Sequence, residues 1–247
     1  TAGGNTAGDT GSCWFTDSGF AVSFGLTPTT GDNAYFQEGT ADSYSFTCDN
    51  VYVSGATLTT VNSGQTIASV TAGSITTNGG IVSNLDAGMT ISTNNGTITG
   101  CAGNVTTNNG TIDSVTVTGV VTTNASSAVI TVNYGTVTEN ASGGTVTTNG
   151  YASTLTTNNG TVTSNLGTIT TNASGAVTSN AGTITTNSAS GNVLANSGTI
   201  TTNSGNVKIG VITGGSGTLS AATTTNLASH TAGTNVTLPS GGGLTWW

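Results

Sequence analysis

The side chains that could carry acid–base chemistry are few in this sequence and lie far apart. The chain of 247 residues has nine Asp or Glu, one Lys or Arg and one His. Cleavage of a glycosidic bond needs a pair of carboxyl groups, or a base with cations that stabilise the developing charge. Between residues 51 and 213 the acids are Asp86, Asp113 and Glu139, each in a different repeat, and the single basic residue is Lys208. This pattern predicts solvent-facing charges, and we expect a protein that is not an enzyme.

No spacing of ligand residues predicts a metal or cofactor site. His230 has no Cys or second His near it in the sequence, and one His does not define a Ser–His–acid triad. Six acids lie within residues 1–50, but without the regular spacing of a dedicated calcium loop. The glycines at 241–243 lack the following Lys of a phosphate-binding loop. We expect no catalytic residues, no metal and no cofactor.

The charge balance excludes two classes of partner. Charged residues make up 4% of the chain and its formal net charge is −8. Nucleic acids and anionic membranes are bound through basic surfaces, which this composition does not provide. The chain also has no run of about 18 apolar residues that could form a membrane span. We expect neither nucleic-acid binding nor membrane insertion.

One short phrase is repeated through the centre of the chain. From about residue 73 to residue 205 the sequence is built from Gly-Thr-(Ile/Val)-Thr-Thr-Asn, as at 144–149, 167–172, 182–187 and 198–203. The Thr-apolar-Thr core alternates with period two and is β-branched, which predicts a very short strand with its apolar side chain inward. Asn and Gly then turn the chain. The repeat therefore predicts an all-β fold.

The spacing of the central apolar residues predicts how these strands are wound. Single steps between them are uneven, at 7 or 9 residues with one of 8, whereas steps counted in threes from Ile75 are 23 to 25 residues long. Because a fixed period marks a repeat architecture, we expect a parallel β-solenoid with three short strands per coil of about 23–25 residues. A flattened coil of two strands and about 14–16 residues is the alternative, since two neighbouring phrases would also close a coil. The residues expected in the core ladder are Ile98, Val121, Val146, Ile169, Ile184 and Ile200.

The two ends of the chain differ in composition from the repeats. Residues 1–50 carry eight aromatic residues and six acids, which predicts an N-terminal cap or small β module. Residues 51–213 form the predicted solenoid, and residues 214–247 a C-terminal tail or assembly segment. The aromatic residues expected to mediate contacts between copies are Trp14, Phe15, Trp246 and Trp247.

The cysteines and the Asn-x-Ser/Thr triplets favour a secreted protein. We expect a disulfide between Cys13 and Cys48, with two buried free thiols as the alternative, and a buried core position for Cys101. The chain begins at Thr1 without a Met or a signal-like stretch, which we interpret as a processed product. Triplets suited to N-glycosylation supply a set of candidate sites. These are Asn95, Asn104, Asn109, Asn124, Asn140, Asn159, Asn172 and Asn235.

Stacked Thr-apolar-Thr phrases would place two ranks of hydroxyl and methyl groups at regular spacing on one side of a solenoid. This motif resembles the ice-binding faces of β-solenoid antifreeze proteins, and the resemblance implies ice binding through such a face. It covers the motif alone, and a Thr ladder is also an ordinary solenoid surface because Thr is a polar strand former. With three strands per coil, one side would carry Thr136, Thr138, Thr161, Thr163, Thr183 and Thr185.

The near-absence of charge favours assembly above the other functions. Neutral, β-branched and hydroxylated surfaces can pack on other copies of the chain, where charges would interfere. We expect a non-enzymatic, secreted structural protein that polymerises into an extracellular filament, sheath or surface fibre. Its partners would be further copies of itself and glycans, outside the cell or on its surface. Ice binding and a phage or cell-surface adhesin fibre are the alternatives.

Overall fold

The computed structural model describes residues 50–209 as one continuous run. Outside that run it describes short strands alone, and the chain divides into two compact units, residues 1–113 and 114–247, which are treated separately below. The short strands are β1 (Ser12–Cys13), β2 (Asn33–Phe36), β3 (Thr40–Ala41), β23 (Gly217–Thr218), β24 (Thr225–Leu227), β25 (Val236–Thr237) and β26 (Leu244–Trp246).

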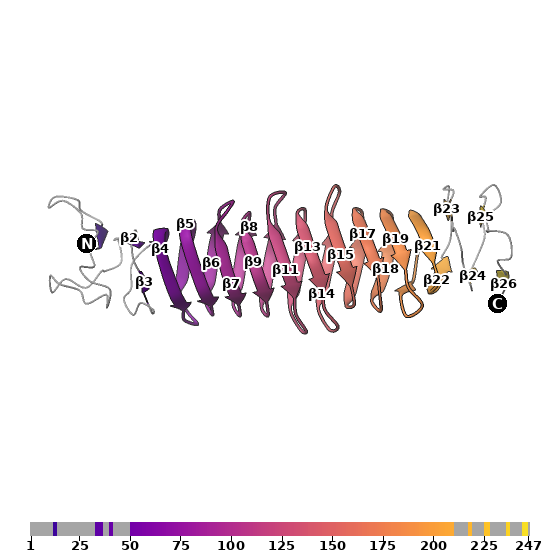
Figure 1. The fold of residues 1–247 in the computed structure, drawn as a ribbon, viewed down its shortest axis with the longest axis horizontal. Helices are drawn as coiled ribbons and strands as arrows, with labels where there is room; N and C mark the ends of the chain where they lie inside the picture. Colours follow the sequence, from indigo (N-terminus) through magenta and orange to yellow (C-terminus); the bar gives the residue numbers. More distant parts are fainter. Residues whose placement is uncertain are drawn as a thin grey trace. The chain divides into compact units, whose positions relative to one another are not determined.

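The first unit is a stack of parallel strands (Figure 1). From β6 onward each strand pairs with the one two positions further along the chain, whereas the longer β4 pairs with β5, and β5 pairs with both β6 and β7. Its β6 pairs with β8 through Val82 and Ile98, and its β7 with β9 through Ile91 and Val105. Pairing with every second strand means that one coil contains two strands. The strands are β4 (Asn50–Val61), β5 (Thr66–Asn78), β6 (Ile81–Leu85), β7 (Thr90–Asn94), β8 (Thr97–Cys101), β9 (Asn104–Asn108) and the first part of β10 (Thr111–Val115).

The second unit repeats the same winding with shorter and more uniform strands. Its β13 pairs with β15 and its β14 with β16, always in parallel and with like residues opposite each other. The strands are β11 (Val120–Asn124), β12 (Val129–Asn133), β13 (Thr136–Asn140), β14 (Thr145–Asn149), β15 (Thr154–Asn158), β16 (Thr161–Asn165), β17 (Thr168–Asn172), β18 (Ala176–Asn180), β19 (Thr183–Asn187), β20 (Asn192–Val193), β21 (Thr199–Asn203) and β22 (Asn206–Ile209).

The predicted all-β parallel solenoid is confirmed, but the prediction of three strands per coil is wrong. Asn158 and its register partner in the next coil, Asn172, are 14 residues apart, whereas Asn140 and Asn158 are 18 residues apart. The alternative, a flattened two-strand coil, is therefore the correct one. Counting in threes gave an even spacing because turns of two to four residues occur in mixed order and their lengths average out over three turns. The strands stay in register while the turns at the corners differ in length, since surface turns accept extra residues at little cost.

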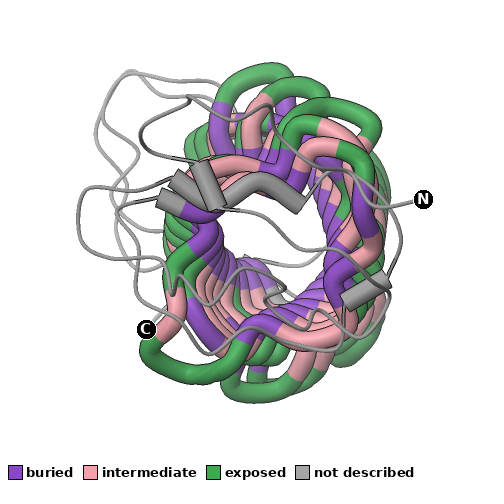
Figure 2. The backbone as a smooth tube through the Cα atoms, turned by 90° about the vertical axis from the view of Figure 1, so that its left-hand side faces the viewer, coloured by how far each residue is buried: buried purple, intermediate pink, exposed green. Residues whose placement is uncertain are grey.

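The second and fifth residues of each five-residue strand face inward. In β17, for example, Ile169 and Asn172 are fully buried, while Thr170 is exposed. In Figure 2 the buried residues line the inside of the tube and the exposed residues lie mostly at its turns. The six residues expected in the core ladder are all fully buried, but they stack on other neighbours than a three-strand coil would give: Ile98 pairs with Val82, and Val146 with Ile130 and Val162.

Buried asparagine amides form two hydrogen-bonded ladders in the second unit. In each ladder the side-chain Nδ2 of one Asn donates to the Oδ1 of the Asn in the next coil, over 2.6–2.9 Å. Several of these Nδ2 groups also donate to a backbone carbonyl, as Asn149 does to Thr168 at 3.2 Å. One ladder contains Asn124, Asn140, Asn158, Asn172, Asn187 and Asn203, and the other Asn133, Asn149, Asn165, Asn180 and Asn196.

The first unit fills the equivalent inward corner in two different ways. On the side formed by β7 and β9 it continues with buried amides, and Asn78 donates to Asn94 at 2.7 Å. On the side formed by β6 and β8 the fifth residue is apolar instead, with Leu85 paired to Cys101. On the first side the buried amides are hydrogen-bonded to each other, and on the second side the residues are apolar. Either arrangement meets the requirement that buried polar groups in a coil interior have partners.

The long strand β5 turns a corner without ending because of one glycine. Gly73 has a φ of +91°, a backbone conformation that side chains with a Cβ rarely adopt. A Cβ at this position would also collide with the backbone carbonyl of Ala56 in the preceding coil. Residues 66–70 of β5 can therefore pair with β6 on one side, while residues 74–78 pair with β7 on the other.

Parallel pairing extends to the short strands near both ends of the chain. Strand β1 pairs with β2 and β2 with β4, whereas β22 pairs with β24 and β24 with β26. The predicted division into a cap over residues 1–50, a solenoid over 51–213 and a tail over 214–247 stays a prediction.

Replacing one amide in the middle of a ladder should destabilise the second unit. In Asn172→Ala, the Nδ2 of Asn158 and the Oδ1 of Asn187 both lose a partner inside the coil. We expect a loss of about 1–3 kcal/mol in the free energy of unfolding, measured by urea denaturation followed by circular dichroism. The control Thr170→Ala, on the outer side of the same strand, should change that value by less than about 0.5 kcal/mol. Equal effects of the two substitutions would contradict a structural role for the ladder.

Candidate binding surface

The most regular surface of the described residues is the outer side of the odd-numbered strands in the second unit. We call the outward side of β13, β15, β17, β19 and β21 the odd face. In all five strands the first and third residues are Thr, and the registers align the first ones from coil to coil. Coils are about 4.8 Å apart, as paired strands are. The ranks consist of Thr136, Thr154, Thr168, Thr183 and Thr199, and of Thr138, Thr156, Thr170, Thr185 and Thr201.

The opposite side of the second unit is less regular. We call the outward side of β14, β16, β18 and β20 the even face. Strands β14 and β16 keep Thr at the first and third positions, but β18 begins with Ala176, and Asn192 and Leu194 follow in the next coil. The two faces therefore differ, and the odd face alone carries an unbroken pair of Thr ranks over five coils.

The predicted Thr face is wrong in its composition. Thr136, Thr138, Thr183 and Thr185 lie on the odd face, whereas Thr161 and Thr163 lie on the even face, on the other side of the coil. The error follows directly from the strand count, because successive phrases in a two-strand coil alternate between the two faces.

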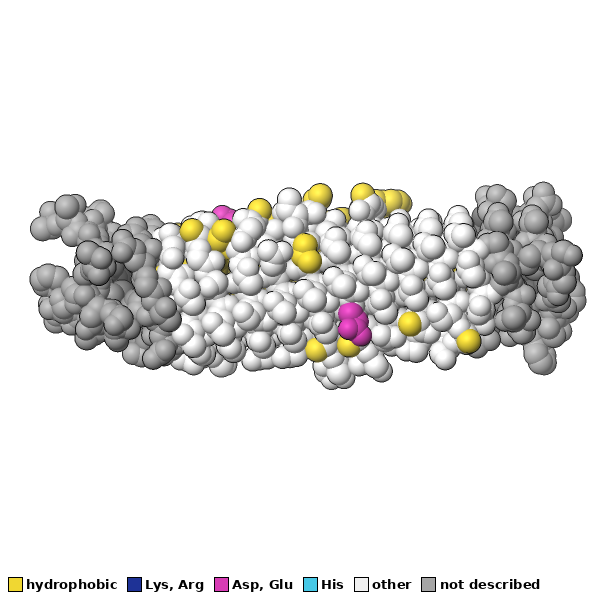
Figure 3. Space-filling view, viewed as in Figure 1, with side chains coloured by type: hydrophobic (Ala, Val, Ile, Leu, Met, Phe, Trp, Pro, Cys, Tyr) yellow, Lys and Arg dark blue, Asp and Glu magenta, His cyan; other side chains and the backbone are white. Residues whose placement is uncertain are grey.

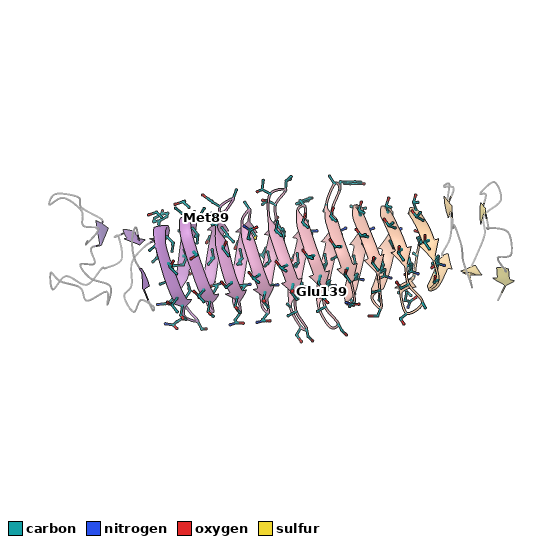
Figure 4. All side chains as sticks on the ribbon, in the orientation of Figure 1. Met89 and Glu139 are labelled. Carbon is teal, nitrogen blue, oxygen red and sulfur yellow. The ribbon has the colours of Figure 1, made fainter. Side chains whose placement is uncertain are left out.

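One carboxylate interrupts the fourth position of the odd-face strands. This position holds Glu139 in β13, labelled in Figure 4, and Thr in the four strands that follow. An oxygen of Glu139 accepts a hydrogen bond of 3.2 Å from the Nδ2 of Asn159, whose Oδ1 in turn accepts one of 3.1 Å from Ser174. The surface visible in Figure 3 is otherwise dominated by neutral polar groups.

The carboxyl groups that the sequence offered for catalysis are not brought together within either unit. Asp86 lies in the turn after β6, Asp113 in β10 and Glu139 in β13. Among the described residues, no three His, Cys, Asp or Glu side chains are close enough to hold a metal ion. His230 lies outside the described residues, and of Lys208 the backbone alone is described.

Cys101 occupies an inward corner position of the first unit and has the properties of a core residue. Its side chain is fully buried, and the thiol donates a hydrogen bond of 3.5 Å to the carbonyl of Gly103. Burial raises the pKa of this thiol to about 12, because the thiolate would be desolvated. The predicted disulfide between Cys13 and Cys48 lies outside the residues whose side chains are described.

Three of the predicted glycosylation sites are wrong. Asn124, Asn140 and Asn172 are fully buried members of the amide ladder, so a folded coil has no room for a glycan on them. The reason is that the Asn ending each phrase faces inward, which the triplet itself does not reveal. Asn95, Asn104 and Asn109 are exposed, Asn159 is half-buried, and Asn235 lies outside the described residues.

The predicted assembly residues also lie beyond what the structure describes. Trp14, Phe15 and Trp247 are outside the described residues, and Trp246 is known through its backbone in β26 alone. What the sequence analysis missed is a set of exposed apolar side chains at the turns. Their signal is a bulky residue at a turn position that usually holds Gly, Ala or Ser. In the second unit they are Val117, Tyr134 and Tyr151.

Comparison of the chain with protein-family models, with curated proteins and with solved structures gave no match. Within the part of the chain that the structure describes, no helix is long and apolar enough to cross a membrane.

The buried thiol of Cys101 should not react in the folded protein. With its pKa raised to about 12, the reactive thiolate is scarce at pH 8.5, and burial blocks the reagent as well. We expect iodoacetamide at pH 8.5 to label Cys101 in urea but not in buffer, as measured by mass spectrometry of the peptide that contains it. Labelling of this residue at similar rates in both conditions would show that the first unit opens readily.

Proposed function

We propose that the protein is a non-enzymatic, secreted structural protein whose solenoids assemble into an extracellular filament, sheath or surface fibre. The observation that supports this best is the interior of the coils. It is filled with apolar and amide ladders, which stabilise a rod through contacts between neighbouring coils. The described carboxylates lie in different strands and turns, which favours a scaffold over a reaction centre.

The proposed assembly uses the same contacts that hold one coil on the next. Parallel strands leave an open edge at the end of a stack, and such an edge can pair with another chain. The described solenoid surface carries few charges, so it adds little repulsion between copies that pack side by side.

Electron microscopy of the purified protein tests the proposed assembly. We expect filaments that persist from low to high salt, because charge contributes little to their contacts. Replacing both Trp246 and Trp247 with Ala should abolish the filaments if these residues join the copies, while Leu194→Ala on the even face serves as the control. Single particles at every protein concentration and salt condition would contradict the proposal.

Ice binding is a second candidate, and the odd face supports it specifically. Its paired Thr ranks run unbroken over five coils, whereas those of the even face do not. A regular, uncharged array of hydroxyl and methyl groups suits an ordered neutral surface such as ice. This candidate is independent of filament formation.

A substitution on either face distinguishes a specific Thr face from a general Thr-rich surface. Both Thr170 on the odd face and Thr163 on the even face are exposed third residues of their strands. We expect Thr170→Tyr to remove most of the thermal hysteresis of the protein, because the ring protrudes from the flat array. The matched control Thr163→Tyr should retain it. Absence of hysteresis in the unmodified protein, or equal losses in the two variants, would reject ice binding.

A further inference from the structure

Three successive turns of the second unit carry a cluster of exposed apolar side chains. These turns lead from an even-numbered strand to the next odd-numbered strand. The turns before β11 and β15 have four residues, 116–119 and 150–153, and the turn between them, before β13, has two, 134–135. In Figure 1 the two longer turns project beyond the shorter one. The middle turn is therefore recessed between two taller neighbours.

Backbone hydrogen bonds fix the order of these turns. The N–H of Tyr134 donates to the carbonyl of Val115 at 2.7 Å, and that of Thr136 to Gly119 at 3.0 Å. On the other side, the N–H of Gly150 donates to Asn133 at 2.8 Å, and that of Thr154 to Gly135 at 3.0 Å. Each turn thus lies directly on its neighbour.

The recessed turn and its two neighbours each display one large apolar side chain. Val117 is 81% exposed, Tyr134 47% and Tyr151 74%. We call these three residues the tyrosine saddle. In the described part of the second unit, Leu194 is the remaining large apolar residue with comparable exposure. Because three of the four lie on consecutive turns, their exposure is concentrated in one patch.

The backbone supports the ring of Tyr134 and fixes the turn that carries Tyr151. A Cβ built on Gly150 would approach ring carbons of Tyr134 to 2.8 Å, so this ring packs directly on the glycine of the next coil. Tyr151 precedes Ala152, which has a φ of +61°, and a non-glycine residue in this region costs energy. Ser153 fixes the same turn by donating to the carbonyl of Gly150 at 2.6 Å.

The chemistry of the saddle fits a neutral carbohydrate. Tyrosine rings present an apolar face with a hydrogen-bonding tip, which suits the C–H face and hydroxyl groups of a sugar ring. Residues 116–119, 134–135 and 150–153 contain no charged side chain, so a charged polymer would find no counter-charge on these turns. Three side chains are also too few for a stable contact with a second copy, which needs roughly 800 Å² on each partner.

We propose that the tyrosine saddle is a binding site for a neutral polysaccharide chain. One sugar ring stacks on Tyr134 in the recess, and Val117 and Tyr151 flank it on the two taller turns. The hydroxyl of Tyr151, on a side chain that is 74% exposed, is available to the sugar hydroxyls. This site goes beyond the proposed scaffold function, because it gives the rod a ligand independently of how the copies assemble.

Binding to a panel of polysaccharides tests the site. The probes are insoluble cellulose and chitin in a sedimentation assay, and soluble β-glucan and mannan in affinity gel electrophoresis. We expect the full chain to bind at least one of them. Tyr134→Ala and Tyr151→Ala should each weaken that binding about tenfold or more, as loss of a central aromatic contact does. Tyr134→Phe, which keeps the ring, and Leu194→Ala, outside the saddle, should retain it.

Several outcomes would overturn this inference. The full chain binding none of the four polysaccharides would do so, as would unchanged binding by folded Tyr134→Ala and Tyr151→Ala, with folding checked by thermal denaturation. If Tyr151→Ala instead turns a dimer into a monomer in analytical ultracentrifugation, the saddle binds a second copy and the carbohydrate site is rejected. Electron microscopy of the same variants tests the scaffold proposal separately. That proposal predicts that Tyr134→Ala and Tyr151→Ala still form filaments.

Discussion

The hydrogen bond between stacked asparagine amides is the constraint on which the coils of the second unit depend. An inward amide at a corner must have both its donor and its acceptor satisfied. In this fold the Asn of the next coil accepts from its Nδ2, and the Asn of the preceding coil donates to its Oδ1. That condition fixes the register between coils, and with it the position of every outward Thr. It also excludes these asparagines from any role at the surface, including glycosylation.

The repeat phrase was enough to predict the strands, their parallel winding and the buried Ile and Val ladders. The number of strands per coil was not predictable in the same way, because it depends on which strands pair, and the variable turns hide that pairing in the sequence. Coils of 14 and 18 residues meet at Asn158, through its bonds to Asn172 and Asn140. The assignment of Thr residues to faces failed for the same reason. Within one phrase the Asn is the fifth residue of the strand and faces inward, whereas the first and third residues are outward Thr. This distinction requires the residue at which each strand begins and ends.

The second unit has two kinds of surface, a periodic one on the odd face and a local one at the tyrosine saddle. The odd face offers a regular array that repeats with the coil, so a partner there must itself be periodic or flat. The tyrosine saddle occurs once among the described coils, and it depends on the particular lengths of three turns. A partner of the odd face and a ligand of the tyrosine saddle can therefore bind the same chain, since they contact different residues.

The turns at the corners accept extra residues without a change in the strands. The number of coils and the lengths of the turns can therefore vary while the fold of each coil stays the same. In the second unit a coil contacts its two neighbours through ladders that are nearly identical from coil to coil, so a complete coil gained or lost by duplication or deletion would leave the remaining junctions as they were. The length of this solenoid unit could therefore change over evolutionary time in steps of one coil. A new turn, meanwhile, could acquire a new side chain without disturbing the interior.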